Sequence, residues 1–161
     1  MAIKVLFVCM GNICRSPVAQ GVFEDAVRRE GLDGEVEVDS AGTGNWHAGQ
    51  PPDARALESA QLRGLDIRHL RARQVTPEDC RTFDYVLTMD EDNYRAVSAL
   101  CDGDGAVVRP FLDFATGSPE REVPDPYYGG PDGFERVIDL VEEASEGLIE
   151  DIRARHLNAG G

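Results

Sequence analysis

The chain has few basic residues, and lysine is almost absent from it. Its 161 residues include 16 Lys and Arg against 30 Asp and Glu, which gives a formal net charge of −14, and Lys4 is the only lysine. An acidic excess of this size opposes the attraction that draws proteins to nucleic-acid backbones and anionic lipids. We therefore expect neither nucleic acid nor membrane among its partners.

Long hydrophobic runs are missing as well, and cysteines are few. No apolar stretch approaches the roughly 20 residues that span a bilayer. The first residues carry one Lys and then a strand-like apolar run without a small-residue cleavage site, so we expect no signal peptide. Four cysteines in a chain of this length do not resemble a secreted disulfide framework. These absences predict a cytoplasmic enzyme with a single domain over residues 1–161.

Strand-like and helix-like patterns alternate along the chain. Short apolar or alternating runs predict strands over residues 4–8, 35–40, 84–89 and 106–111. Helical spacing and capping residues predict helices from 17 to about 31, over 53–63, from 76, over 91–100 and from about 132. This order predicts an α/β fold: a three-layer, four-stranded parallel twisted sheet with helices on both faces, in flavodoxin-like order. Ligand sites in such sheets lie at the carboxyl ends of the strands.

A cysteine, a short turn and an arginine follow directly on the first predicted strand. Cys9 ends the strand, and five residues separate it from Arg15. This length suffices to wrap a phosphate with successive backbone N–H groups. Gly11 and Asn12 tolerate the positive φ values that such a turn needs. The loop is therefore a candidate phosphate loop.

The same loop leads into a helix. Ser16 as N-cap and Pro17 as first helical residue match the usual start of a helix. A helix N-terminus attracts tetrahedral oxyanions, and together with Arg15 it favours an anionic sulfur on Cys9. The pattern predicts the chemistry of a cysteine-based phosphatase.

Other phosphate and metal motifs do not fit this loop. The three spaced glycines of a dinucleotide turn and the Gly-Lys-Ser/Thr of a nucleotide P-loop are both missing. Cys9 and Cys14 lack a second ligand pair at the spacing of a zinc site. We therefore expect no cofactor and no metal.

Cleavage of a phosphomonoester also needs a proton donor for the leaving oxygen. Asp125 is the best candidate, because Pro124 and Pro126 flank it and restrict its backbone. Tyr127 and Tyr128 follow and could form the walls of an aromatic slot. An Asp-Pro pair alone is more often a structural turn, but beside the Cys9 loop we interpret Asp125 as catalytic.

These residues resemble the low-molecular-weight protein tyrosine phosphatase family over essentially the whole chain. The loop fits the family's Cys-x5-Arg-Ser pattern at every defining position: Cys9, Met10, Gly11, Asn12, Ile13, Cys14, Arg15 and Ser16. The resemblance implies a metal-independent enzyme in which Cys9 is the nucleophile and Arg15 stabilises the transition state. It implies that Asp125 acts as general acid and then as base. Ser16 would donate to the Cys9 sulfur, and the loop from Met10 to Cys14 would hold the phosphate.

The resemblance extends to supporting residues. Ser40 matches a residue that bonds Asn12 and keeps the phosphate loop in shape. Trp46 matches an aromatic wall of the substrate cleft opposite the two tyrosines, although a lone Trp is more often part of a core. His69 matches a histidine that braces the loop, and a satisfied core histidine is the alternative.

Regulation and partners are also implied by the resemblance. Cys14 is close enough in sequence to Cys9 for a disulfide that would protect the nucleophile from over-oxidation. A buried small residue is the equal alternative for Cys14. The implied partner is a phosphotyrosine-bearing protein such as a bacterial tyrosine kinase, and we expect a monomer or weak dimer.

Three other functions share this loop. A thioredoxin-coupled arsenate reductase needs two relay cysteines; Cys80 falls in the right region, but no partner follows within a few residues, and such enzymes generally lack the Asp-Pro loop. A protein-arginine phosphatase tends to have threonine where Ile13 stands. A non-enzymatic binding module would have lost Cys9 or Asp125. Phosphotyrosine hydrolysis is therefore the leading hypothesis.

Overall fold

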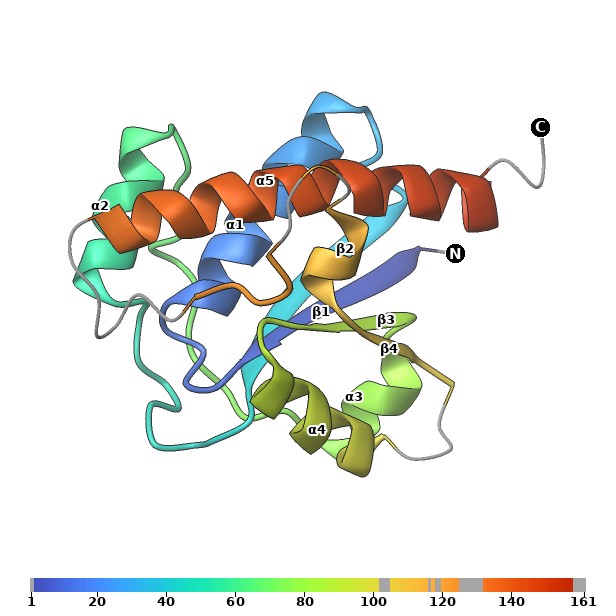
Figure 1. Cartoon of the computed structure of the whole chain (residues 1–161), viewed down its shortest axis with the longest axis horizontal. Helices are drawn as coiled ribbons and strands as arrows, with labels where there is room; N and C mark the ends of the chain where they lie inside the picture. The colour runs from blue at the N-terminus through green and yellow to red at the C-terminus, as the bar shows by residue number, and fades with distance from the viewer. Residues whose placement is uncertain (1, 102–104, 116, 118–119, 125–131, 158–161) are drawn as a thin grey trace.

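Four parallel strands form the centre of the fold (Figure 1). The computed structural model describes residues 2–101, 105–115, 117, 120–124 and 132–157. The sheet has the order β2-β1-β3-β4, built from β1 (Ile3–Cys9), β2 (Val36–Gly42), β3 (Tyr85–Thr88) and β4 (Val107–Pro110). The helices are α1 (Arg15–Arg29), α2 (Ala54–Leu62), α3 (Pro77–Thr82), α4 (Glu91–Leu100) and α5 (Asp132–Ile152). The predicted α/β fold is confirmed.

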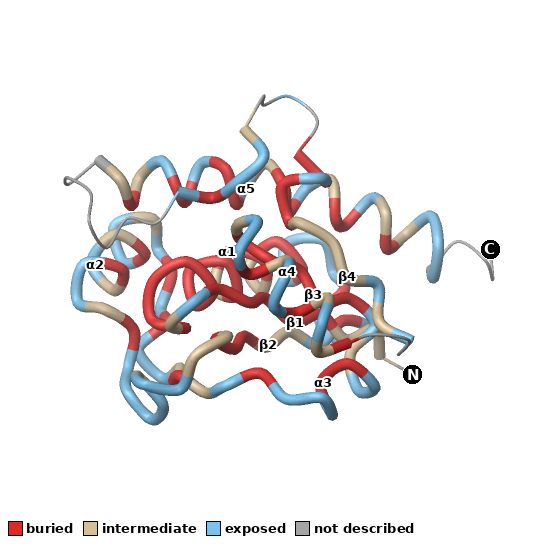
Figure 2. Tube along the Cα trace, turned by 60° about the horizontal axis from the view of Figure 1, so that its bottom comes forward, coloured by how far each residue is buried: buried red, intermediate tan, exposed pale blue. Residues whose placement is uncertain are grey.

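Alternate residues of β1 supply two hydrophobic cores, one on each face of the sheet. Val5 and Phe7 pack into the larger core with α1 and α5. Leu6 and Val8 pack into a smaller core with side chains of α3 and α4. All four side chains are fully buried, and β1 is red in Figure 2 over all but its first two residues. A strand buried on both faces explains why 4–8 reads as a continuous apolar run.

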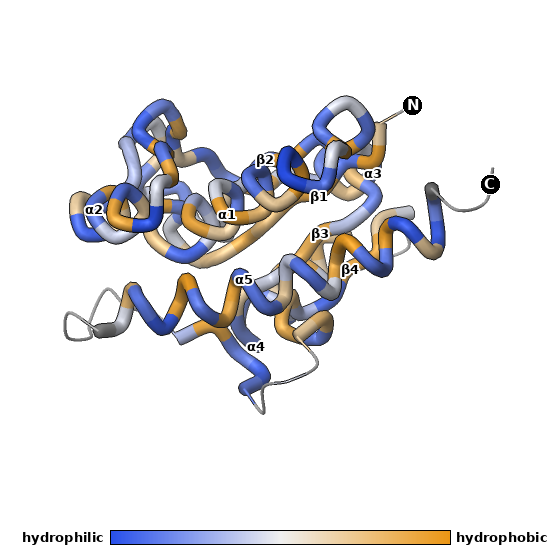
Figure 3. Tube along the Cα trace, turned by 90° about the horizontal axis from the view of Figure 1, so that it is seen from above, coloured by the Kyte–Doolittle hydropathy of each residue, from blue (hydrophilic) through white to orange (hydrophobic). Residues whose placement is uncertain are grey.

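The closing helix α5 lies against α1 on one face of the sheet. Hydrophobic and hydrophilic residues alternate along it at helical spacing (Figure 3). The side of α5 that faces the core consists of buried apolar residues, among them Phe134, Val137, Ile138, Val141, Leu148 and Ile152. Gly147 lets α5 approach the backbone of Phe114, since a Cβ at that position would collide with the Phe114 carbonyl.

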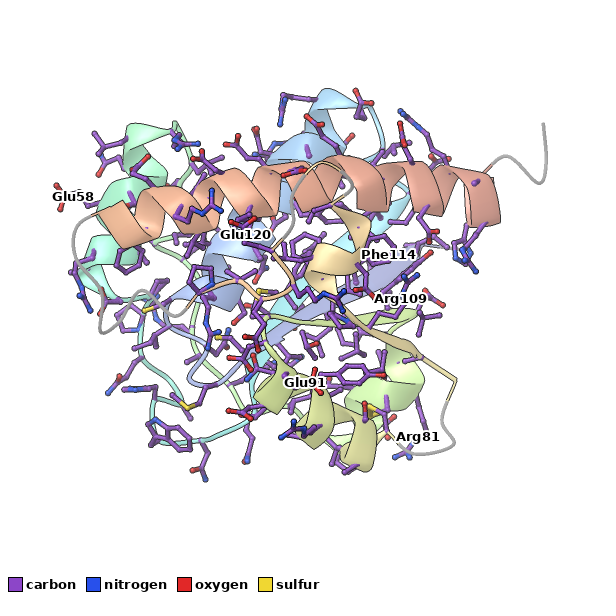
Figure 4. The ribbon with its side chains drawn as sticks, viewed as in Figure 1. Glu58, Arg81, Glu91, Arg109, Phe114 and Glu120 are labelled. Carbon is purple, nitrogen blue, oxygen red and sulfur yellow. A yellow bond between two sulfur atoms is a disulfide. The ribbon has the colours of Figure 1, made fainter. Side chains whose placement is uncertain are left out.

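The last predicted strand is shorter than the sequence pattern indicates. It ends at Pro110, and a 3₁₀ turn, η1 (Phe111–Phe114), follows where the pattern predicts one more strand residue. Phe111 and Leu112 turn into the core under α5, which competes with continued strand pairing. The Arg109 guanidinium lies 4.8 Å from the centre of the Phe114 ring (Figure 4) and joins the strand to the turn.

A disulfide joins the two helices on the smaller core. Cys80 of α3 and Cys101, the C-cap of α4, are bonded with their Cα atoms 5.2 Å apart. This pair was not predicted from the sequence. It is invisible in the sequence pattern because 21 residues separate the partners, and only the packing of α3 and α4 on one face brings them together. Cys9 and Cys14 take no part in a disulfide.

Candidate active site

The loop after β1 sits at the carboxyl edge of the sheet. Cys9 is the last residue of β1 and pairs with Gly42, the last residue of β2. A Cβ on Gly42 would lie 2.8 Å from the Met10 carbonyl oxygen and 3.2 Å from Asn12 Cβ, so only glycine lets the two loops approach this closely. Asn12 has φ of +59°, the one described non-glycine residue with positive φ. The predicted tight turn is present.

The carbonyl groups of the loop are held by neighbouring segments. Gly44 N–H donates to the Met10 carbonyl at 3.0 Å, and Asp53 N–H donates to the Ile13 carbonyl at 2.8 Å. On the other side of the loop, Asn12 N–H points at the Cys9 sulfur, 3.3 Å away. These bonds fix the peptide planes, so that the conformation of the loop is set before any ligand arrives.

The Cys9 sulfur lies in a polar environment beside the start of α1. The Ser16 hydroxyl oxygen is 3.0 Å from it, and Cys9 is only 3% exposed. α1 begins at Arg15 with Cys14 as N-cap, two residues earlier than the sequence predicts. The prediction that Ser16 caps the helix is wrong, because its hydroxyl is engaged by Cys9 and Asn12 instead.

Asn12 connects the loop to the rest of the fold. Its side-chain amide donates to Ser16 Oγ at 2.8 Å and to Ser40 Oγ at 3.0 Å, so the expected Ser40–Asn12 bond is present. Its Oδ1 accepts from the backbone N–H of Arg73 at 3.0 Å. Every polar atom of this buried amide therefore has a partner.

Arg73 is itself held between two carboxylates. Its guanidinium forms ion pairs with Asp39 and Asp79, both at 3.0 Å. Burial on its own lowers the pKa of Arg73, but the bonds to Asp79 and Asp39 raise it overall. The segment that holds Asn12 is thereby tied to β2 and α3.

The resemblance assigned the bracing of this loop to His69, and the structure places that residue elsewhere. His69 is exposed, and no hydrogen bond joins it to the loop within the described part of the chain. The alternative that His69 is a core histidine with satisfied hydrogen bonds is therefore wrong as well. The Ser40 hydroxyl donates instead to Gln20 Oε1 at 2.8 Å. Sequence reasoning missed Gln20, which is 6% exposed and lies on the inner side of α1.

Arg15 is a buried cation with two identified partners. Its side chain donates to Asp90 Oδ2 at 2.7 Å and to the Val123 carbonyl at 3.1 Å, and the residue is 3% exposed. Asp90 is the N-cap of α4 and follows β3 at the same sheet edge as Cys9. Sequence reasoning missed Asp90, although an aspartate just after a buried strand was the available signal.

The segment 120–124 is attached beside this arginine. Val123 N–H donates to the Met89 carbonyl at 2.7 Å, and Glu91 N–H donates to Glu122 at 2.7 Å. Glu91 opens α4 (Figure 4). The chain is therefore fixed next to Arg15 just before the predicted proton donor. Asp125, Tyr127 and Tyr128 themselves lie outside the described residues.

Trp46 and Met10 are large hydrophobic side chains that are exposed to solvent. Trp46 is 60% exposed and Met10 is 40% exposed, so the alternative of a core tryptophan is wrong. The Trp46 ring lies over Gly44, whose position leaves no room for a Cβ. His47, from the same segment, lies against Gly11 of the phosphate loop. Trp46 is therefore linked to the phosphate loop through Gly44, whose N–H donates to the Met10 carbonyl, and through its neighbour His47.

The described residues contain no group of three His, Cys, Asp or Glu side chains that could hold a metal ion. None of the helices within the described ranges is long and apolar enough to cross a membrane.

Comparisons with known proteins agree with this fold and with one another. The family model for low molecular weight phosphotyrosine protein phosphatase matches residues 4–158. A putative low molecular weight protein-tyrosine-phosphatase of Synechocystis is 45% identical over 96% of this chain and 99% of its own. The low molecular weight phosphotyrosine protein phosphatase of Schizosaccharomyces pombe is 41% identical over 93% and 97%. A protein tyrosine phosphatase structure from Entamoeba histolytica has a TM-score of 0.92 at 40% identity, covering 95% and 98%. The chain therefore belongs to the low molecular weight phosphotyrosine protein phosphatase family.

Proposed function

We propose that this protein tyrosine phosphatase hydrolyses phosphotyrosine monoesters through a cysteinyl-phosphate intermediate on Cys9. One observation carries the proposal: the Cys9 sulfur faces the Ser16 hydroxyl at 3.0 Å and the Asn12 N–H at 3.3 Å, next to the start of α1 and the buried Arg15. Two hydrogen-bond donors, a helix N-terminus and a cation all favour the anionic sulfur that attacks phosphorus.

In the first step the Cys9 thiolate attacks phosphorus, and the bond between phosphorus and the tyrosine oxygen breaks. Asp125 gives its proton to the leaving phenolate. The amides of the loop, from Met10 to Cys14, hold the phosphoryl oxygens, and the Arg15 guanidinium stabilises the charge on the equatorial ones. The products of this step are tyrosine and phosphocysteine.

In the second step water attacks the phosphocysteine. Asp125, now a carboxylate, takes a proton from this water, while the sulfur leaves as thiolate under the donors Ser16 and Asn12. Inorganic phosphate is released, and Asp125 is protonated again. The role of Asp125 is supported by its distance along the chain: it follows Val123, which bonds Arg15, by two residues, a span of about 7 Å at most.

The substrate is aromatic in this proposal. The exposed Trp46 offers one face for a tyrosine ring, and Tyr127 and Tyr128 supply the facing wall. Ile13 contributes an apolar side chain inside the loop, where arginine-directed relatives by resemblance tend to have threonine. Phosphotyrosine is therefore favoured over phosphoarginine.

The wider setting is part of the same proposal. We expect a cytoplasmic location, a protein partner such as a bacterial tyrosine kinase, and a monomer or weak dimer.

Cys14, buried at 5% exposure beside the nucleophile, would form a reversible disulfide with Cys9 on oxidation. If so, peroxide-treated wild type recovers activity with thiol and Cys14→Ser does not; equal irreversible loss in both would refute this protection.

The test compares two peptides of the same sequence, one with phosphotyrosine and one with phosphoarginine, in buffer that contains a metal chelator. We expect the phosphotyrosine peptide to be hydrolysed with the higher kcat/KM. Cys9→Ser should abolish turnover, and Asp125→Ala should lower kcat by roughly 10² to 10⁴-fold.

Two outcomes would contradict the proposal. Undiminished turnover by Cys9→Ser would show that Cys9 is not the nucleophile. A higher kcat/KM for phosphoarginine would keep the chemistry but assign the other substrate class.

A further inference from the structure

Gln20 stands at the inner end of a chain of hydrogen bonds that leads to the nucleophile. The chain runs from Gln20 through Ser40, Asn12 and Ser16 to the sulfur of Cys9, and each link is between 2.8 and 3.0 Å long. All five residues are at most 6% exposed. Water therefore does not supply alternative partners for these groups.

The orientation of the Asn12 amide is determined by its neighbours. Arg73 N–H can only donate, so the atom it contacts at 3.0 Å must be the amide oxygen of Asn12. The amide nitrogen of Asn12 then donates one hydrogen to Ser16 and the other to Ser40.

The orientation of Gln20 is determined in the same way at the other end. The Val38 carbonyl can only accept, and it lies 3.3 Å from Gln20 Nε2. Gln20 therefore presents its amide oxygen to Ser40. Since Ser40 already accepts from Asn12, its single hydroxyl hydrogen is donated to that oxygen.

These orientations determine which group the Ser16 hydroxyl can donate to. Ser16 also accepts from Asn12, so its own hydrogen is free for the sulfur at 3.0 Å; the competing Ala41 carbonyl is more distant, at 3.4 Å. With its two hydrogens and its oxygen all bound, Asn12 keeps the positive φ that shapes the loop.

We propose that Gln20 is a positioning residue of this phosphatase: by accepting from Ser40 it holds Asn12, and through Asn12 it directs the Ser16 hydroxyl to Cys9. It touches neither substrate nor the reacting atoms. In this protein it takes the bracing role that the family resemblance assigns to His69. The inference rests on the proposed function of Cys9 as nucleophile.

Gln20→Met tests the inference, because methionine keeps the length of the side chain and removes the acceptor. We expect kcat/KM for a phosphotyrosine peptide to fall about fivefold, the usual effect of one lost hydrogen bond, with the loss mainly in kcat. The rate at which iodoacetamide alkylates Cys9 in mildly acidic buffer should fall as well. Gln61→Met is the matched control, since Gln61 is exposed on α2.

A double-mutant cycle separates positioning from general destabilisation. If Gln20 acts through Ser40, then Gln20→Met adds no further loss in a Ser40→Ala background. Independent losses in the two variants, as a merely structural effect would give, overturn the proposal. So does a His69→Ala variant that slows the enzyme more than Gln20→Met does.

The alkylation readout distinguishes this proposal from the proposed function. If wild type does not turn over phosphotyrosine, the proposed function fails, while the change in Cys9 alkylation still reports on Gln20. If wild type is active and Cys9→Ser is inactive, but Gln20→Met alkylates and turns over like wild type, only the role of Gln20 fails.

Discussion

The contact between Arg15 and Asp90 offers the sharpest test of how the site is assembled. Asp90→Asn is the informative change, because the two carboxylate oxygens have different partners. Oδ1 accepts from Asn93 N–H at 2.8 Å and caps α4, and an asparagine oxygen can do the same. Oδ2 accepts from Arg15 at 2.7 Å, and an NH₂ group in its place would face another donor.

The size of the effect follows from this one bond. A hydrogen bond to a charged group contributes about 1.5–3 kcal/mol, and the Arg15 side chain is only 4% exposed while that of Asp90 is 23% exposed, so solvent screens the pair weakly. Each 1.4 kcal/mol corresponds to about tenfold in rate. If the bond holds Arg15 in its working position, kcat/KM should fall by about 10- to 150-fold.

The assay is steady-state hydrolysis of a phosphotyrosine peptide, together with inhibition by inorganic phosphate. Asp92→Asn is the control: it makes the same change two residues further along α4, where the side chain is 93% exposed and 3.9 Å from Arg95. A kcat/KM for Asp90→Asn within twofold of that of the control would mean that Asp90 does not position Arg15.

Three further predictions concern the substrate wall, a half-buried carboxyl and the disulfide. Gly44→Ala should raise KM for aryl phosphates by about 2- to 10-fold with little change in kcat, because the new Cβ displaces the Trp46 ring. Burial raises the pKa of Glu24 above its usual 4.5, so the wild type loses stability as pH rises through that raised value; in thermal melts Glu24→Gln should match wild type near pH 4 and melt higher near pH 7. Reducing the disulfide, or replacing Cys101 by Ser, should lower Tm by about 6–12 °C, because a loop of 21 residues closed by Cys80–Cys101 stabilises by about 3 kcal/mol; an unchanged Tm in reductant would contradict it.

The parts of the site that are local in sequence could be predicted from the sequence. Cys9 and Arg15 lie within seven consecutive residues, and one strand end and one helix start suffice to bring them together. The element order and the buried side of α5 follow from hydrophobic spacing for the same reason.

Contacts between distant segments could not be predicted in this way. Asp90 meets Arg15 across 75 residues, and Cys80 meets Cys101 because two short helices share one face of the sheet. The cap at Ser16 was predicted wrongly since statistics of helix starts do not include a competing sulfur and amide. His69 was assigned by resemblance, whereas in this chain Gln20 reaches Ser40 from inside the fold.

Trapping the intermediate would show whether Cys9 carries the phosphoryl group. The wild-type protein is mixed with a phosphotyrosine peptide labelled with ³²P and quenched in acid within the first turnover, and the labelled fragment is identified by mass spectrometry. We expect phosphate on the sulfur of Cys9 and no label in Cys9→Ser. Label on another residue, or turnover without Cys9, would contradict this expectation.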